Sequence, residues 1–282
     1  MFFLNPAKQS LSRYALCAAL AFAGMSLDAK AADFSGSEQT PEPDFDGSRF
    51  KNDPPEANWS LIIGAGAMLE PEYEGSDKFE VGPLPIVLFT YGQWLEIDPR
   101  GVTVKAFERD GFSLSGKIGY ETGRDEGDAD ELEGLGDIDF AATVGLKAAY
   151  EWGPLEIYAS IDQTIDGSES LIGKVGAEYT APVTEQFILG AGVEATIAND
   201  KHMEAYFGVN AAQSARSGLP EYDAGAGLKR VDFSASATYL INEHWLVRGQ
   251  AGVGVLTGDA ADSPIVKEKV QPSTSLFVGY KF

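Results

Sequence analysis

Alternation of apolar and polar residues dominates this chain from residue 58 to its end. In residues 112–121 one parity is polar or small and the other is apolar or aromatic, the apolar positions being Phe112, Leu114, Ile118 and Tyr120. Later segments repeat this pattern, with lapses at Leu246 and Phe277. Such alternation predicts β-strands that have one apolar and one polar face. No segment carries a sustained helical period, so we predict an all-β fold class.

About twelve strands are expected from this alternation. Ten are clear, at residues 59–69, 111–121, 138–151, 154–165, 170–181, 185–198, 203–211, 226–240, 243–257 and 272–282. Residues 80–91 add an eleventh, although Pro83 and Pro85 weaken it. In residues 93–107 the apolar parity reverses, which indicates either one bulged strand or two strands joined by a turn at Asp98-Pro99-Arg100-Gly101. A barrel with both ends in the periplasm needs an even number of strands, so we expect one bulged strand there.

In a soluble sandwich, the apolar parities of the strands meet in a common core and the polar parities face water. In a transmembrane barrel, the apolar parity faces lipid and the polar parity fills the lumen. The polar parity is rich in glycine, at Gly64, Gly66, Gly190, Gly192, Gly252 and Gly254. Aromatic residues lie near strand ends, as an interfacial girdle requires, at Trp59, Tyr120, Tyr150, Tyr179, Phe187, Tyr239 and Trp245. The alternating Val278, Tyr280 and Phe282 resemble the C-terminal assembly signal of bacterial outer-membrane barrels. We therefore predict an antiparallel transmembrane β-barrel of about twelve strands that ends in Phe282.

The first 31 residues have the pattern of a secretory signal peptide. Lys8 and Arg13 precede an apolar run too short to span a bilayer, and Ala29-Lys30-Ala31 has the small-x-small pattern of a cleavage site. We expect cleavage after Ala31, which would remove Cys17 and leave a mature chain without disulfides. Residues 32–57 are acidic and contain four prolines, so we predict a flexible leader before a barrel at residues 58–282.

Charge restricts the partners of this chain. The formal net charge of −22 excludes nucleic acid, because phosphate binding requires clustered Lys and Arg. The polar parity of the strands nevertheless carries both signs, at Lys117, Asp139, Lys147, Glu156, Asp162, Glu178, Glu194, Arg230, Asp232 and Arg248. Lumens become clearly aqueous only at about 16 strands. The sequence thus leaves two interpretations open, a lumen plugged by internal salt bridges and a narrow pore.

Residues 122–137 form a strongly acidic segment, with Asp125, Glu126, Asp128, Asp130, Glu131, Glu133 and Asp137. Oxygen ligands at this density suit Ca²⁺, but the spacing of an EF-hand is absent. We interpret the segment as a solvated, mobile loop, with weak cation binding as the alternative. Because residues 93–107 are expected to form one strand, this loop is expected at the periplasmic end.

Little in the sequence supports catalysis. His202 and His244 are the only histidines and are expected to be polar turn or interface residues. No G-x-S-x-G motif and no His/Glu zinc spacing is present. In GDAADSPIV, residues 258–266, the polar side chains of Asp259, Asp262 and Ser263 are expected to serve as turn and capping groups of the last extracellular connection, far from His244. We predict no catalytic, cofactor-binding or metal-binding residues; a barrel enzyme acting on lipid is the least favoured alternative.

Three segments together are hard to obtain by chance: YFGV at 206–209, SARSGLPEY at 214–222 and GDAADSPIV at 258–266. With residues 71–89 and the terminal GYKF, they resemble the MipA/OmpV family over about residues 58–282. The resemblance implies a lipid-embedded β-barrel of the bacterial outer membrane. It also implies a scaffold that links a murein lytic transglycosylase to a penicillin-binding protein, while other members are associated with adhesion or with osmotic and antibiotic responses. We therefore expect a non-enzymatic scaffold, with a narrow porin-like channel as the alternative.

Overall fold

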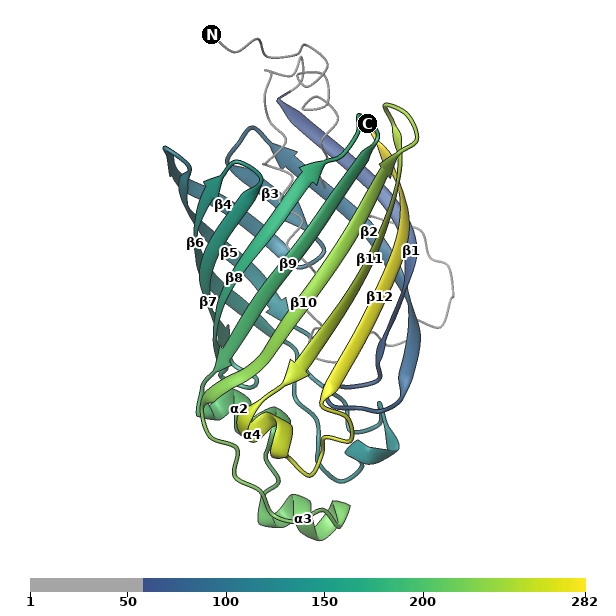
Figure 1. The fold of residues 1–282 in the computed structure, drawn as a ribbon. Helices are drawn as coiled ribbons and strands as arrows, with labels where there is room; N and C mark the ends of the chain where they lie inside the picture. Colours follow the sequence, from purple (N-terminus) through teal and green to yellow (C-terminus); the bar gives the residue numbers. More distant parts are fainter. Residues whose placement is uncertain (1–57) are drawn as a thin grey trace, which may run out of the picture.

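The computed structural model describes residues 58–282, so the predicted signal peptide and leader lie outside the described residues. The described chain forms a closed antiparallel barrel of twelve strands, in which consecutive strands are neighbours and β1 pairs with β12 (Figure 1). None of its described helices is long and apolar enough to cross a bilayer. The predicted fold class and strand number are confirmed.

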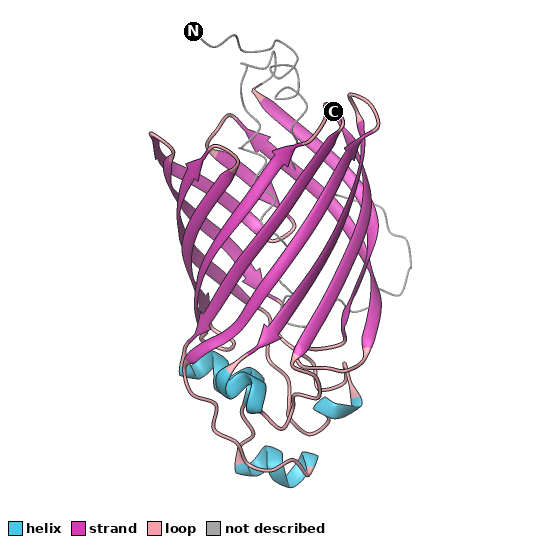
Figure 2. Ribbon diagram, in the orientation of Figure 1, coloured by secondary structure: helices cyan, strands magenta, loops and turns pink. Residues whose placement is uncertain are grey.

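The strands are β1 Trp59–Pro71, β2 Phe79–Tyr91, β3 Leu95–Asp98, β4 Gly101–Arg109, β5 Phe112–Glu121, β6 Ala141–Trp152, β7 Leu155–Ile165, β8 Leu171–Pro182, β9 Phe187–Ala198, β10 Gly227–Leu240, β11 Trp245–Leu256 and β12 Val270–Lys281. The helices are η2 Asp130–Leu132, α2 Asp200–Phe207, α3 Ala211–Ser217 and α4 Gly258–Asp262. All four lie at the end of the barrel opposite the C-terminus (Figure 2).

Two local predictions were wrong. One strand too few was expected at residues 93–107 and one too many at residues 203–211, so the total of twelve is still right. Residues 93–107 hold the hairpin β3–β4 instead of one bulged strand, because Asp98 Oδ1 accepts hydrogen bonds from the amides of Arg100 and Gly101 at 2.8 and 3.0 Å. Residues 203–211 are not a strand. They belong mostly to α2, which begins where the Asn199 side chain accepts a hydrogen bond from the amide of His202.

The two ends of the barrel differ in loop length. At the C-terminal end, short turns join the strands at residues 92–94, 110–111, 153–154, 183–186 and 241–244. At the other end, longer connections lie at residues 72–78, 122–140, 166–170, 199–226 and 257–269, and the two-residue β3–β4 turn at 99–100 is the one short exception. Outer-membrane barrels have short periplasmic turns and longer extracellular loops. The helical end is therefore extracellular, and the acidic segment 122–137 lies there. The expected periplasmic position was wrong because one strand was expected at residues 93–107, where the structure has two. The strands between residues 111 and 198 therefore run in the direction opposite to the expected one. The strands after residue 226 run as expected, because the strand wrongly expected at 203–211 cancels the first error.

The apolar parity faces outward along the barrel wall. Leu146 and Leu276 are each 57% exposed, whereas the inward Asp232 is 4% exposed. Predicted girdle aromatics are also exposed near strand ends, including Tyr120, Tyr150, Tyr179, Tyr239 and Trp245. An apolar exterior around a polar, buried interior distinguishes a membrane barrel from a soluble sandwich.

The two lapses in the alternation point into the barrel and pack together. Leu246 and Phe277 belong to a buried apolar cluster that we call the lumen core: Ile62, Leu84, Ile86, Leu88, Ile188, Leu240, Leu246 and Phe277. Its members come from six adjacent strands, β9 to β12, β1 and β2. Gly66 makes room for it, since a Cβ at that position would lie 2.6 Å from the Cβ of Phe277. The lumen core therefore fills one side of the lumen toward the periplasmic end.

Candidate functional site

Charged residues of the inward parity form ion pairs within the lumen. Lys147 Nζ lies 3.2 Å from Glu156 Oε1, and Lys174 Nζ lies 3.1 Å from Glu194 Oε1. The hydroxyl of Tyr158 donates to Glu194 Oε2 at 2.6 Å. These contacts join β6 to β7, β8 to β9 and β7 to β9. The lumen therefore contains the internal salt bridges that the sequence left as one of two interpretations.

The other predicted lumen residues fall into three groups. Arg230, Asp232 and Arg248 are buried, and Arg248 Nη1 donates to Thr238 Oγ1 at 3.0 Å. Partly exposed inside the barrel are Lys117, Asp162 and Glu178. Asp139 was misassigned, because β6 begins at Ala141 and leaves Asp139 exposed in the preceding extracellular connection.

A buried polar cluster lies where the extracellular connections meet the wall. We call it the anchor cluster: Glu74, Glu121, Ser168, Ser170, His202, Lys229, Arg230 and Asp232. On one side, the Glu74 carboxylate pairs with Lys229 Nζ at 3.2 Å and with Arg230 Nη1 at 3.3 Å. Arg230 Nε also donates to Asp232 Oδ1 at 2.6 Å. Glu74 thereby ties the β1–β2 connection to β10.

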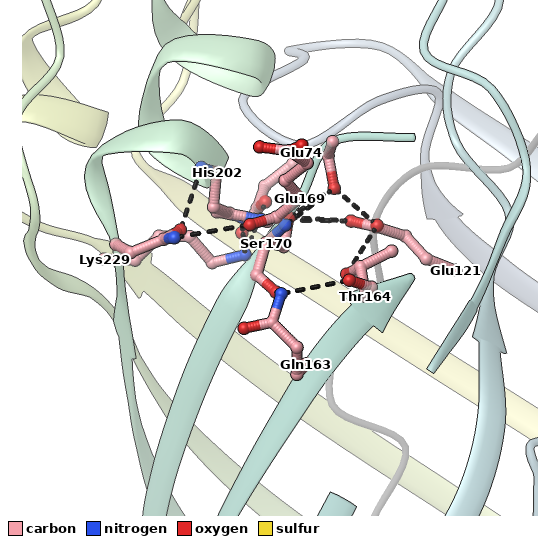
Figure 3. Close-up of polar contacts among 10 residues, drawn as sticks. Glu74, Glu121, Gln163, Thr164, Glu169, Ser170, His202 and Lys229 are labelled. Atoms are coloured by element: carbon pink, nitrogen blue, oxygen red, sulfur yellow. Dashed lines mark hydrogen bonds and ion pairs between the residues drawn. The ribbon is translucent and has the colours of Figure 1, made fainter. Parts of the chain in front are cut away.

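The other side of the anchor cluster surrounds His202 (Figure 3). Its Nδ1 lies 2.7 Å from Ser170 Oγ, and its Nε2 lies 3.2 Å from Lys229 Nζ. The Glu121 carboxylate accepts hydrogen bonds from Ser168 at 2.6 Å and from Ser170 at 3.3 Å. These contacts connect α2, the β7–β8 connection, β5 and β10 within one polar network.

The expected turn position of His202 was wrong, because His202 lies within α2. Its side chain is 0% exposed, and its ring stacks on Tyr206 at a centroid distance of 4.7 Å. Serine, histidine and carboxylate lie together here, yet the geometry differs from a catalytic triad. A triad places a carboxylate on the ring nitrogen opposite the serine, whereas Lys229 occupies that position. Ser170 is also 1% exposed and buried from solvent. The arrangement is that of a structural anchor.

His244 lies in a turn at the membrane interface, as the sequence predicted. It lies exposed in the β10–β11 turn at the periplasmic end, next to the girdle residue Trp245. Its ring stacks on Tyr280 at 5.3 Å, and its Nδ1 lies 2.9 Å from the carbonyl of Lys281. His244 is therefore an interface residue at the opposite end of the barrel from the anchor cluster.

The extracellular connections fold over the anchor cluster as a cap. One apolar cluster packs α2 against α4 through Met203, Phe207, Ala260 and Ala261. A second gathers Tyr73, Ala129, Leu132, Leu135, Val209 and Ile265 from separate connections. Burial raises the pKa of the Tyr73 hydroxyl, which donates to the carbonyl of Ile265 at 3.1 Å. The cap is thus a small packed structure with its own apolar contacts.

The segment GDAADSPIV forms α4 and the start of the connection to β12. Asp259 Oδ2 accepts from the amide of Gly225 at 2.9 Å, and Asp262 pairs with Lys269 at 2.9 Å. Ser263 Oγ donates to the carbonyl of Phe207 at 2.6 Å, which ties α4 to the end of α2. The expected turn role fits Ser263, whose Oγ also accepts a hydrogen bond from the amide of Ile265 at 3.3 Å. The expected capping role was wrong, because α4 has no side-chain cap. The segment is far from His244, as expected, although α2, which packs against α4, carries His202.

The acidic segment 122–137 is folded into the cap and is not a simple solvated loop. Leu132 is 0% exposed, and Glu126 Oε2 accepts from the amides of Gly134 and Gly136 at 3.1 and 2.8 Å. The hydrogen bond from the Lys78 ammonium lowers the pKa of the Glu131 carboxyl. Within residues 58–282 no group of three or more Asp, Glu, His or Cys is arranged to hold a metal ion. The acidic side chains instead bind backbone amides and neighbouring cations.

Comparison with known proteins identifies the family. The family model described as MltA-interacting protein MipA matches residues 63–282. The chain belongs to this family. The MltA-interacting protein of Escherichia coli strain K12 is 25% identical over 232 residues, 80% of this chain and 91% of that protein. YiaT of the same strain, described by name as an outer membrane protein, is 24% identical over 212 residues, 73% of this chain and 84% of that protein.

Among solved structures, similar barrels have low sequence identity to this MipA-family chain. The NanC porin has a TM-score of 0.42 and 9% identity, covering 79% of this chain and all of that one. The translocator domain of the autotransporter NalP from Neisseria meningitidis has a TM-score of 0.43 and 12% identity, covering 82% of this chain and 90% of that one. Family, fold and the named relatives place this protein in the outer membrane.

Proposed function

We propose that this MipA-family barrel is a non-enzymatic scaffold for the murein machinery of the cell envelope, with a lytic transglycosylase and a penicillin-binding protein as partners. The observation that carries the proposal is the family match over residues 63–282, since the family is described by its interaction with MltA. The relative that bears this name aligns over 91% of its own length. An interaction partner in the murein layer must reach the periplasmic end of the barrel.

The geometry of the lumen supports a scaffold better than a conduit. The cap and the anchor cluster cover the extracellular end, and the lumen core fills one side of the periplasmic half. The cavities between the ion pairs have volumes of about 30 and 100 Å³. Ligand sites for drug-sized molecules occupy roughly 300–1,000 Å³. Each of these two cavities is too small for a drug-sized solute, which favours a surface role over passage through the lumen.

The periplasmic turns of the described barrel are short. In the sequence, residues 32–57 precede Asn58 and the periplasmic start of β1 at Trp59. Their acidic side chains are Asp33, Glu38, Glu42, Asp44, Asp46, Asp53 and Glu56. Complementary charge steers association between proteins. The scaffold proposal therefore assigns the main contact to this segment and a basic surface to its partner.

Affinity capture from detergent-solubilised envelopes tests the proposal. The tagged full chain should recover a lytic transglycosylase and a penicillin-binding protein. A chain that lacks residues 33–57 should recover much less, because only the short turns remain. Lys269→Met, in an exposed pair on the extracellular cap, is the matched control and should recover as much as the wild type. Repeated capture without either enzyme would contradict the scaffold.

Planar bilayer recordings test the channel alternative. The reconstituted barrel should show no defined conductance steps, because the cap covers the extracellular end and the lumen core fills one side of the periplasmic half. A porin reconstituted in the same lipid is the positive control. Reproducible steps that depend on the amount of this protein would favour the channel instead.

A further inference from the structure

The larger lumen cavity gathers most of the lysines inside the barrel. It has a volume of about 100 Å³ and lies against β2 to β9, beside the lumen core. Lys105, Lys117, Lys147 and Lys174 line it from four strands. Gln93 and Trp94, from the periplasmic β2–β3 turn, line it as well. The cavity therefore extends toward the periplasmic end.

Strand register arranges these cations in an alternating row. Residues directly opposite each other on adjacent strands are Lys105, Ser115, Lys147, Ser160, Lys174, Thr196 and Arg230, from β4 to β10. We call this set the cation row. Every second strand contributes a positive charge and each strand between contributes a hydroxyl. Ammonium and hydroxyl donors bind carboxylate and phosphate oxygens through strong, charge-assisted hydrogen bonds.

Acidic residues line the same cavity, namely Glu96, Asp98, Glu156, Asp162 and Glu194. The two that pair with lysines of the row are more buried than those lysines. The side chain of Lys147 is 20% exposed, whereas that of its partner Glu156 is 1% exposed. Lys174 and Glu194 show the same order, at 23% and 13%. The Lys147 ammonium also lies 4.7 Å from the ring centre of Tyr158, which fixes its position. The carboxylates thus hold the lysines in place, and the lysines form more of the accessible surface.

Arg230, the last member of the row, lines a second cavity beside the larger one. It is 2% exposed, and its Nη2 has no hydrogen-bond acceptor among residues 58–282. It lines the neighbouring cavity of about 30 Å³ together with Tyr158 and Glu194, which line the larger cavity too. A buried guanidinium donor is costly to leave unsatisfied. The row therefore ends on a donor suited to an oxyanion or to a water molecule bound beside it.

We propose that this cavity binds a small oxyanion, the carboxylate or phosphate group of a periplasmic solute, through the cation row. The anionic group contacts Lys147 and Lys174 on the wall, and the rest of the solute extends toward Trp94 at the mouth. The volume admits one small charged group and excludes an oligomer. This site is separate from the scaffold surface and does not depend on it.

Calorimetric titration of the purified full barrel in detergent tests the site. Inorganic phosphate and succinate serve as the two probes, at constant ionic strength maintained with sodium chloride. Saturable binding of at least one probe is expected, and its identity distinguishes phosphate from carboxylate solutes. Lys147→Met and Lys174→Met should each weaken binding about tenfold, since each removes one charge-assisted contact. Glu156→Gln should strengthen binding, because it removes the carboxylate that competes for Lys147.

Matched controls separate this site from a purely structural salt-bridge network. Lys269→Met removes a lysine from an exposed pair on the cap and should leave binding unchanged. If Lys147→Met fails to fold, Lys174→Met, from the same row and cavity, carries the test alone. Absence of saturable binding by the wild type would overturn the proposal. Equal weakening by Lys269→Met, or weakening by Glu156→Gln, would overturn it as well.

Discussion

Replacement of Arg230 with methionine should lower the free energy of unfolding by about 3–5 kcal/mol, the range found when one partner of a buried ion pair is removed. The guanidinium contacts both Glu74 and Asp232, whose side chains are 4% and 6% exposed. Glu74 keeps Lys229, but Asp232 loses the only cation with which it forms a salt bridge in the described chain. Urea titration of the barrel in lipid vesicles, followed by tryptophan fluorescence, measures the loss.

Arg109→Met is the matched control for this substitution. Arg109 pairs with Asp110 at the periplasmic end, where the two side chains are 77% and 88% exposed. Exposed pairs contribute about 0–1 kcal/mol, so its effect should be small. Adding Asp232→Asn to Arg230→Met should recover part of the loss, because the second substitution removes the stranded charge. Similar small effects of Arg230→Met and Arg109→Met would contradict the assigned role of the anchor cluster.

Replacement of Phe277 with alanine should cost about 3–5 kcal/mol, as large-to-small substitutions in packed cores do. Phe277 is 8% exposed and lies within the lumen core. Removal of the ring leaves a cavity that rigid barrel strands cannot close. The same urea titration measures the change.

Leu276→Ala provides the control from the adjacent position on the opposite face. Leu276 is 57% exposed on the outer wall, where lipid tails fill the space that the side chain leaves. No internal cavity forms, so the loss should stay below about 2 kcal/mol. A larger effect at Leu276 than at Phe277 would show that the inward and outward faces of β12 are assigned wrongly.

Much of the fold could be predicted because one physical pattern repeats in every long strand. Period two fixes which side chains share a face, and the glycine-rich polar face identified the interior. The errors fell on short elements. In residues 203–209, apolar Met203, Phe207 and Val209 fit alternation, while Met203 and Phe207 also fit a helical spacing. Eight residues of α2 are too few for either period to be decisive, and tertiary contacts with α4 settle the helix.

The interior was predictable as a list of residues but not as a set of contacts. Parity alone placed Lys147, Glu156, Glu194 and Arg230 inside the barrel. Lys147 and Glu156 belong to one hairpin, so their proximity follows from a short turn. Glu74 and Arg230 approach only after the barrel has brought the β1–β2 connection next to β10. His202 escaped prediction for the same reason, since its partners come from β10 and from the β7–β8 connection.

The barrel, its inward and outward faces and its family were predictable from the chain alone, because side-chain alternation and local motifs are properties of neighbouring residues. The anchor cluster, the packed cap, the extracellular position of the acidic segment and the cation row became visible only in the folded barrel. Those features depend on strand direction and cross-strand register, which are set by turns and barrel closure and not by any single stretch of sequence.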